Sequence, residues 1–158
     1  MGRAAQALGF RYITVTEHTL SNPGVRGLSA EDLERQWTEL NDVQRQLKGL
    51  RILRGIESDI RADGSLDLPT SLLGRLDIVI GSVHERFGQS PEQMTERLLR
   101  ALDHPHLHVL GHPFGRLIAR RAPIRFYFEA VAQKAKRRGV ALEVNGNPER
   151  LDLSGEYV

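Results

Sequence analysis

Short apolar runs alternate with amphipathic segments along the whole chain. Five runs rich in valine, isoleucine and leucine have the length of strands, at residues 12–16, 52–56, 76–83, 107–110 and 140–144. Their nearly continuous apolar character is typical of strands that are covered on both faces, as in a parallel sheet. The pattern therefore predicts an α/β fold.

Signals for helices lie between these runs. Ser29 and Asp32 have the spacing of a capping box, and an apolar stripe at helical spacing follows them. Ser90 followed by Pro91 predicts a second helix, with an N-cap and a proline in the first helical position. A third helix is predicted to end at Gly139, because glycine readily adopts the left-handed cap conformation.

The alternation is interrupted once and is incomplete at both edges. The dipeptide Asp63-Gly64 is suited to a tight turn and predicts a hairpin. Residues 3–10 have the pattern of the second half of a helix that ends at Gly9, and residues 147–158 contain no closing element. We therefore expect residues 1–158 to form a single, partial α/β domain with about five strand–helix units.

Composition narrows the possible chemistry. The chain has 158 residues, of which 40% are hydrophobic and 27% charged, as is usual for one soluble globular domain. A formal charge of +2 permits an anionic partner without requiring one. Cysteine is absent, which excludes disulfides and thiolate chemistry and favours a cytoplasmic location. No apolar run approaches the roughly 20 residues that a membrane span needs.

Residues that can bind metal follow the predicted strands one after another. Strand by strand, they are Glu17 with His18, Glu57 with Asp59, His84, His112, and Glu143 with Asn145. Because the C-terminal ends of parallel strands lie on one face, we expect His18, Glu57, His84 and His112 to converge. A lone histidine after a strand is usually an ordinary polar residue, but four successive strand ends indicate a site for Zn²⁺, Mn²⁺ or Fe²⁺.

Three further histidines form a dense tract that we do not expect to bind metal. His104 and His106 precede the fourth predicted strand, and His108 lies inside it, away from its C-terminal end. We expect all three to be structural.

Five segments together carry a resemblance to a known family. They are YITVTEH, GIESDIRADGSLDL, LDIVIGSVHERF, HVLGHPFGRL and LEVNGNPERLDL, and they cover nearly the whole chain. In order and spacing they resemble the PHP (polymerase and histidinol phosphatase) superfamily, above all the C-terminal PHP domain of bacterial X-family DNA polymerases. The resemblance implies part of a distorted, TIM-like (β/α)7 barrel that binds two or three divalent metal ions, Mn²⁺ or Zn²⁺.

The resemblance also implies roles for individual residues. His18, His84 and His112 stand at the histidine ligands of three family motifs. Glu57 stands at the carboxylate that bridges metals, and Glu57 and His84 are the implied catalytic residues. Asp59 is expected to support a ligand from behind rather than to bind metal itself.

The chain departs from the family pattern at three places. An opening H-x-H motif and a closing D-x-H motif are absent, so we expect fewer metal ions than in an intact site and unpaired strand edges. Glu17 stands where the family has aspartate, and its extra methylene is expected to misorient His18 or to shift a metal.

Basic residues near the strand ends are candidates for substrate binding. Arg116 is expected to clamp a phosphate with two parallel hydrogen bonds. Asn145 and Arg150 follow the fifth strand and are expected to orient the substrate. Arg120 and Arg121 are either contacts to a nucleic-acid backbone or plain surface residues.

Three functions remain open at this point. The first is a metal-dependent phosphoesterase linked to an X-family DNA polymerase, which would act on the backbone or 3′ ends of DNA as a 3′–5′ exonuclease, AP-endonuclease or 3′-phosphatase. The second is a free-standing phosphatase for small phosphate monoesters such as histidinol phosphate. The third is an inactive remnant that binds DNA or a protein partner, such as the polymerase portion of a longer chain.

Overall fold

A parallel β-sheet organises the chain. The computed structural model describes residues 1–22 and 24–158. Its strands, all parallel and neighbours in chain order, are β1 (Tyr12–His18), β2 (Arg51–Asp59), β3 (Ile78–Ser82), β4 (Val109–Leu110) and β5 (Ala141–Leu142). The predicted α/β class and the parallel sheet are confirmed. Within the described residues β1 and β5 do not pair with each other, so the sheet is open.

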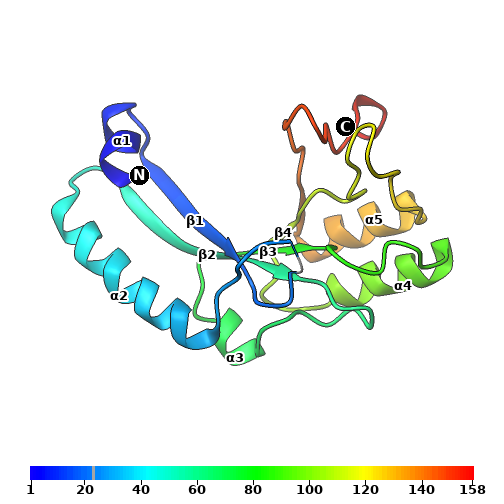
Figure 1. The fold of residues 1–158 in the computed structure, drawn as a ribbon, viewed down its shortest axis with the longest axis horizontal. Coiled ribbons are helices and arrows are strands. Elements are labelled where there is room, and N and C mark those ends of the chain that lie inside the picture. The colour runs from blue at the N-terminus through cyan, green and yellow to red at the C-terminus, as the bar shows by residue number, and fades with distance from the viewer. Residues whose placement is uncertain (23) are drawn as a thin grey trace.

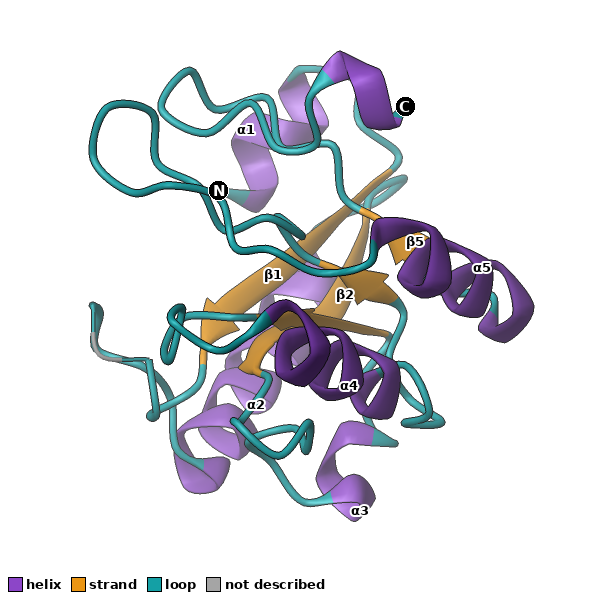
Figure 2. Cartoon of the chain, turned by 90° about the vertical axis from the view of Figure 1, so that its right-hand side faces the viewer, coloured by secondary structure: helices purple, strands orange, loops and turns teal. Residues whose placement is uncertain are grey.

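One helix precedes β1, and one helix follows each of the strands β1 to β4. The helices are α1 (Gly2–Ala7), α2 (Ala30–Gln46), α3 (Thr70–Leu73), α4 (Pro91–Ala101) and α5 (Phe128–Arg138), followed by a short 3-10 turn, η1 (Gly155–Tyr157). In Figure 1, α2 and α3 lie below the strands, α4 and α5 lie together on the right, and both termini lie above. In Figure 2, turned by 90°, α4 lies in front of the strands, and α2 and α3 again lie below them. Among the described residues, no helix has the length and apolar character required to cross a bilayer.

The helix boundaries follow the capping signals. The Ser29 hydroxyl accepts from the backbone N–H of Asp32 at 3.1 Å, and the Asp32 carboxylate accepts from the backbone N–H of Ser29 at 3.0 Å. The backbone N–H and the hydroxyl of Ser29 both donate to the Asp32 carboxylate and, together with Arg35, lower the pKa of Asp32 to about 2. Ser90 forms a second capping box, and Gly139 ends α5 with φ of 68°. The three predicted helix ends are confirmed.

The predicted hairpin is present in a reduced form. Gly64 has φ of 86° and donates its N–H to the carbonyl of Arg61 at 2.8 Å. Only a single antiparallel bridge, between Ile60 and Leu66, follows from this turn. A Cβ on residue 64 would lie 2.7 Å from the carbonyl oxygen of Arg97, so glycine is required there for space as well as for its backbone angle.

The main core lies between the strands and the long helices. Leu33 of α2, Leu98 of α4 and Val131 of α5 have no exposed surface, and they belong to one apolar cluster with strand residues such as Ile56 and Val79. Burial of this continuous apolar cluster is what holds the strands and helices together.

Strand β1 differs from the expectation that every strand is covered on both faces. Val15 is its only buried residue, and Tyr12 is 65% exposed. The prediction is wrong for this strand because few apolar side chains cover its faces, and only a small cluster of Ala5, Leu47 and Leu50 packs against Ile13 near its start.

A buried arginine ties α4 to the loops behind the strand ends. Arg97 is only 1% exposed, and its guanidinium donates to the carbonyl of Glu85 at 3.1 Å, to the side chain of Gln89 at 2.9 Å and to the carbonyl of Ile60. Burial lowers its pKa, while the charges of Glu85 and Asp59 oppose that shift. The apolar pattern of α4 gives no indication of a buried cation at this position.

We expect Arg97→Ala to lower the free energy of unfolding by about 3–5 kcal/mol, because it leaves a cavity and removes the partner of buried carbonyl groups. Arg100→Ala is the control on the same helix: Arg100 is exposed and pairs with Glu96, and it should change stability by about 0.5 kcal/mol or less. Urea denaturation followed by circular dichroism measures both. Equal stability of the two variants would contradict the tying role of Arg97.

Candidate metal centre

The sheet register brings the first ligand candidates together. His18 is the last residue of β1, and its Cα pairs with that of Glu57 on β2. Asp59 lies two residues further along β2 and pairs with Ser82, near the end of β3. Because side chains alternate along a strand, Glu57 and Asp59 lie on the same face of the sheet. The strand ends therefore build one polar site, as the sequence predicts.

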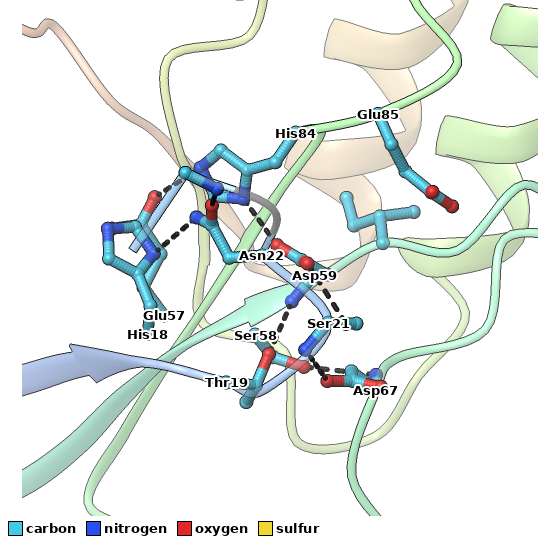
Figure 3. Close-up of polar contacts among 12 residues, drawn as sticks. His18, Thr19, Ser21, Asn22, Glu57, Ser58, Asp59, Asp67, His84 and Glu85 are labelled. Atoms are coloured by element: carbon cyan, nitrogen blue, oxygen red, sulfur yellow. Dashed lines mark hydrogen bonds and ion pairs between the residues drawn. The ribbon is translucent and has the colours of Figure 1, made fainter. Parts of the chain in front are cut away.

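Three imidazoles surround one carboxylate. The ring centroids of His18 and His84 are 5.0 Å apart, and those of His84 and His112 are 5.2 Å apart. Oε1 of Glu57 lies 3.3 Å from Nε2 of His84 and 3.1 Å from Nε2 of His112, and Oε2 lies 3.6 Å from Nε2 of His18. Figure 3 shows Glu57 between His18 and His84.

His84 is held from behind by a buried carboxylate. Its Nδ1 hydrogen-bonds to Asp59, which is 2% exposed. The other oxygen of Asp59 accepts from the Ser21 hydroxyl at 2.9 Å, and the backbone N–H of Asp59 donates to Thr19 at 3.2 Å (Figure 3). This arrangement turns Nε2 of His84 toward Glu57, as carboxylates do for histidines that bind metal.

His18 has a separate orienting partner. The Asn22 side-chain amide donates to Nδ1 of His18 at 3.1 Å, while its oxygen accepts from the backbone N–H of Gly24 at 2.8 Å. The ring is thereby fixed with Nε2 facing Glu57. Sequence reasoning missed Asn22, which lies in an irregular loop where neither periodicity nor a motif marks it.

His112 is positioned through its backbone. Its N–H donates to Oε2 of Glu143 at 2.6 Å, and the other oxygen of Glu143 accepts from the Asn145 amide at 3.1 Å. His112 has φ of 24°, an unfavourable backbone angle for a residue with a Cβ that persists only where surrounding contacts enforce it. Glu143 supplies such a contact.

The charges of the site are strongly coupled. Burial favours the neutral acid of Glu57, but hydrogen bonds from His112 and His84 outweigh it and hold the pKa of this carboxyl far below its usual range. Burial also disfavours a charged His84, yet Asp59 and Glu57 raise the pKa of that imidazole to about 9. The ionised Glu57 therefore attracts positive charge from every side, and a cation at this point competes with a proton on His84.

The donor atoms fit a divalent metal ion. His18, Glu57 and His84 each offer a ligand atom, and these atoms lie within 4.8 Å of one another. Imidazole and carboxylate suit Zn²⁺, Mn²⁺ or Fe²⁺. His112 contacts the same carboxylate but lies outside this set of three. The three predicted histidine ligands thus meet around the fourth candidate, Glu57.

Arg116 and Asn145, which were predicted to bind substrate, have hydrogen-bond partners within the protein. The Nε of Arg116 donates to the carbonyl of Arg150 at 2.6 Å, and its Nη2 donates to the carbonyl of Leu151. Arg116 therefore joins two loops. The Asn145 amide holds Glu143, and its oxygen accepts from the N–H of Asn147 at 3.0 Å, so both ends of this side chain are used within the protein.

The expected effect of Glu17 on His18 is wrong. Glu17 precedes His18 on β1 and is exposed. Strand alternation directs neighbouring side chains to opposite faces, so the extra methylene of Glu17 extends away from the imidazole cluster.

The histidine tract lies elsewhere. Nε2 of His104 lies 3.2 Å from the Thr70 hydroxyl, and Nδ1 of His108 accepts from the backbone N–H of Val79 at 3.0 Å. The ring of His106 lies beside that of His104, with 5.8 Å between centroids.

A cavity of about 280 Å³ opens beside the imidazoles. His18, His84, Arg121 and Arg150 are among its lining residues. Arg150 was predicted from its place after the fifth strand, whereas the sequence left Arg121 undecided between nucleic-acid contact and surface.

Comparison with known proteins agrees with these features. The chain is 37% identical over 158 residues to a DNA polymerase/3′-5′ exonuclease PolX of Bacillus subtilis, a match that covers 100% of this chain and 28% of the relative. It is 28% identical over 158 residues to a probable phosphatase of Clostridium acetobutylicum, covering 98% of this chain and 60% of that protein. A probable phosphatase of Caldanaerobacter subterraneus is 30% identical over 149 residues, covering 92% of this chain and 54% of the relative.

The relatives are named as an exonuclease-containing polymerase and as phosphatases, and the chain matches only part of each. No protein-family model matches the chain. The chain spans little more than a quarter of the polymerase and 54–60% of the two phosphatases. The names of the relatives agree with the hydrolase expected from the sequence.

We expect Asp59→Asn to weaken the binding of Zn²⁺ or Mn²⁺ by about 10- to 100-fold, because the amide no longer holds His84 with a full negative charge. Asp77→Asn is the matched control. Asp77 directly precedes β3, at the end of the strand away from the imidazoles, and its carboxylate accepts from the backbone N–H of Arg54 at 2.9 Å. Isothermal titration calorimetry measures the affinities. Unchanged affinity in Asp59→Asn would contradict the role assigned to Asp59.

Proposed function

We propose that this chain is a PHP-type, metal-dependent phosphoesterase domain that acts on phosphate esters at the ends of DNA. The observation that carries the proposal is the group of three imidazoles around the ionised Glu57 at the ends of parallel strands. The exonuclease and phosphatase names of the relatives support a hydrolase. The five parallel strands would then form part of a distorted (β/α)7 barrel, with residues 1–158 as a single partial domain.

Similarity favours the polymerase-linked branch over a free-standing phosphatase. The match to the polymerase/exonuclease is 37% identical over the full chain, against 28–30% for two probable phosphatases. The proposed activities are therefore those of a 3′–5′ exonuclease, an AP-endonuclease or a 3′-phosphatase. The phosphatase matches, which also cover more than nine tenths of the chain, favour small phosphate monoesters as the second candidate substrate.

The site residues have different proposed roles in binding metal and substrate. His18, Glu57, His84 and His112 would hold Mn²⁺ or Zn²⁺, with Glu57 as the central carboxylate ligand, and we expect fewer ions than the two or three of an intact site. When bound, such cations activate water and neutralise the charge of a phosphate group. Asp59 and Asn22 orient the imidazoles, and Glu143 sets the backbone of His112. Arg150, on the wall of the adjoining cavity, would contact the substrate.

The experiment measures Mn²⁺-dependent hydrolysis of 3′-recessed DNA, a DNA end with a 3′-phosphate, and histidinol phosphate. We expect turnover of a DNA substrate, loss of activity with EDTA, and a fall in kcat/KM of at least about 100-fold in Glu57→Gln, since this variant removes the charge that the imidazoles surround. Glu96→Gln on the exposed side of α4 serves as the control and should retain activity.

The outcome separates the candidate functions. Turnover of histidinol phosphate alone would favour the small-molecule phosphatase. A purified chain that retains no metal and hydrolyses none of the three substrates would contradict the phosphoesterase proposal and favour an inactive domain that binds DNA or a partner.

A further inference from the structure

The cavity beside the candidate metal centre has two chemically different walls. His18 and His84 line one part of it, and Arg121 and Arg150 line another. Its volume of about 280 Å³ lies near the lower end of the range for small-molecule pockets, so it has room for a phosphate and the group esterified to it. The arginines reach this cavity from two separate loops, which the backbone of Arg150 and the side chain of Arg116 join.

Arg150 directs an unpaired donor into buried surroundings. Its Nη1 is buried and has no hydrogen-bond acceptor among residues 1–22 and 24–158. A buried cationic donor without an acceptor is unfavourable, and native proteins rarely retain one unless a ligand, ion or water completes it. The backbone of Arg150 is anchored, because its carbonyl accepts from Nε of Arg116 at 2.6 Å.

Arg121 is held rigidly but keeps its terminal nitrogens available. Its Nε donates to the carbonyl of Gly115 at 2.7 Å, and its guanidinium carbon lies 4.0 Å from the centroid of the Phe87 ring. No residue in the described part of the chain accepts from its Nη1 or Nη2. Burial, and then the charge of Arg150, lower the pKa of Arg121. Both arginines line the cavity, and no carboxylate is among the described residues that line it.

The neighbouring arginines are used differently. Arg116 donates to two backbone carbonyls, and the side chain of Arg120 is 70% exposed and lies 3.6 Å from Glu149. The basic segment after His112 therefore contains one loop-joining residue, one surface residue and one residue that faces the cavity.

We propose that Arg121 and Arg150 are the phosphate-binding pair of this protein, and that they grip the non-bridging oxygens of a phosphate ester whose scissile bond faces His18 and His84. The inference rests on the proposed function and deepens it. Guanidinium groups bind tetrahedral oxyanions through paired, charge-assisted hydrogen bonds, which the free terminal nitrogens of both residues can form. Arg116, which the sequence singled out for this task, instead positions the loop that carries Arg150.

The test compares Arg121→Gln and Arg150→Gln with Arg120→Gln as the matched control. In the EDTA-treated chain, titration with inorganic phosphate by calorimetry measures the arginine pair without any metal. We expect Arg121→Gln and Arg150→Gln each to weaken phosphate binding about 10-fold or more, because each removes one or two charge-assisted hydrogen bonds. Arg120→Gln should bind phosphate like the parent chain.

In the Mn²⁺-loaded chain, the same two variants should raise KM for the substrate about 10-fold while metal content is unchanged. Arg121→Lys and Arg150→Lys keep the positive charge but lack the planar guanidinium that donates two parallel hydrogen bonds. They should bind substrate more tightly than the glutamine variants and less tightly than the parent chain. If a glutamine variant fails to fold by circular dichroism, the lysine variant at that position decides the comparison.

The outcomes separate this inference from the proposed function. Phosphate affinity in Arg121→Gln and Arg150→Gln equal to that of Arg120→Gln, or no phosphate binding by the parent chain, overturns the arginine pair. A parent chain that binds phosphate through these arginines but retains no metal supports the pair and contradicts the phosphoesterase.

Discussion

The attraction between one ionised carboxylate and three imidazoles is the interaction on which the functional face of this protein depends. Glu57 lies near the end of β2, a strand with neighbours on both sides, and its two oxygens face His18, His84 and His112. Burial alone would neutralise this acid, but the imidazole donors keep its pKa low. A negative charge fixed in a half-buried position is a natural point for a divalent cation, and the histidines supply the borderline ligands that Zn²⁺ and Mn²⁺ accept.

The residues around this group act mainly by orientation. Asp59, Asn22 and Glu143 each bind a different histidine, through Nδ1 of His84, Nδ1 of His18 and the backbone N–H of His112. Asp59 is itself held by Ser21 and Thr19. Such a supporting layer holds donor atoms in place before a metal arrives, which lowers the entropic cost of binding it. It also explains why strained backbone is tolerated at His112.

The loops after β4 and β5 contribute arginines to the cavity beside the imidazoles. Arg116 spans them through two carbonyl groups, and this link brings the guanidinium of Arg150 to the same cavity as that of Arg121. Arginine is suited to both tasks because its planar group can bridge carbonyls or bind an oxyanion. The neighbouring arginines differ in whether their guanidinium groups have a hydrogen-bond acceptor within the protein.

The sequence by itself determined the elements and their order. Apolar runs, the capping serines and Gly139 predicted the strands and helices, and the parallel arrangement implied that His18, Glu57, His84 and His112 would converge. These are consequences of local chemistry and of a periodicity that any reader of the chain can follow.

Only the tertiary structure decided how side chains that are remote in the chain partner one another. It exposed one face of β1, turned Glu17 away from His18, buried Arg97 and brought Asn22 to an imidazole. It also bound Arg116 to two backbone carbonyls and placed Arg121 on the wall of the cavity. Long polar side chains reach several ångströms in many directions, and the acceptors available to them come from loops whose approach no local pattern encodes. Their roles therefore depend on the folded geometry.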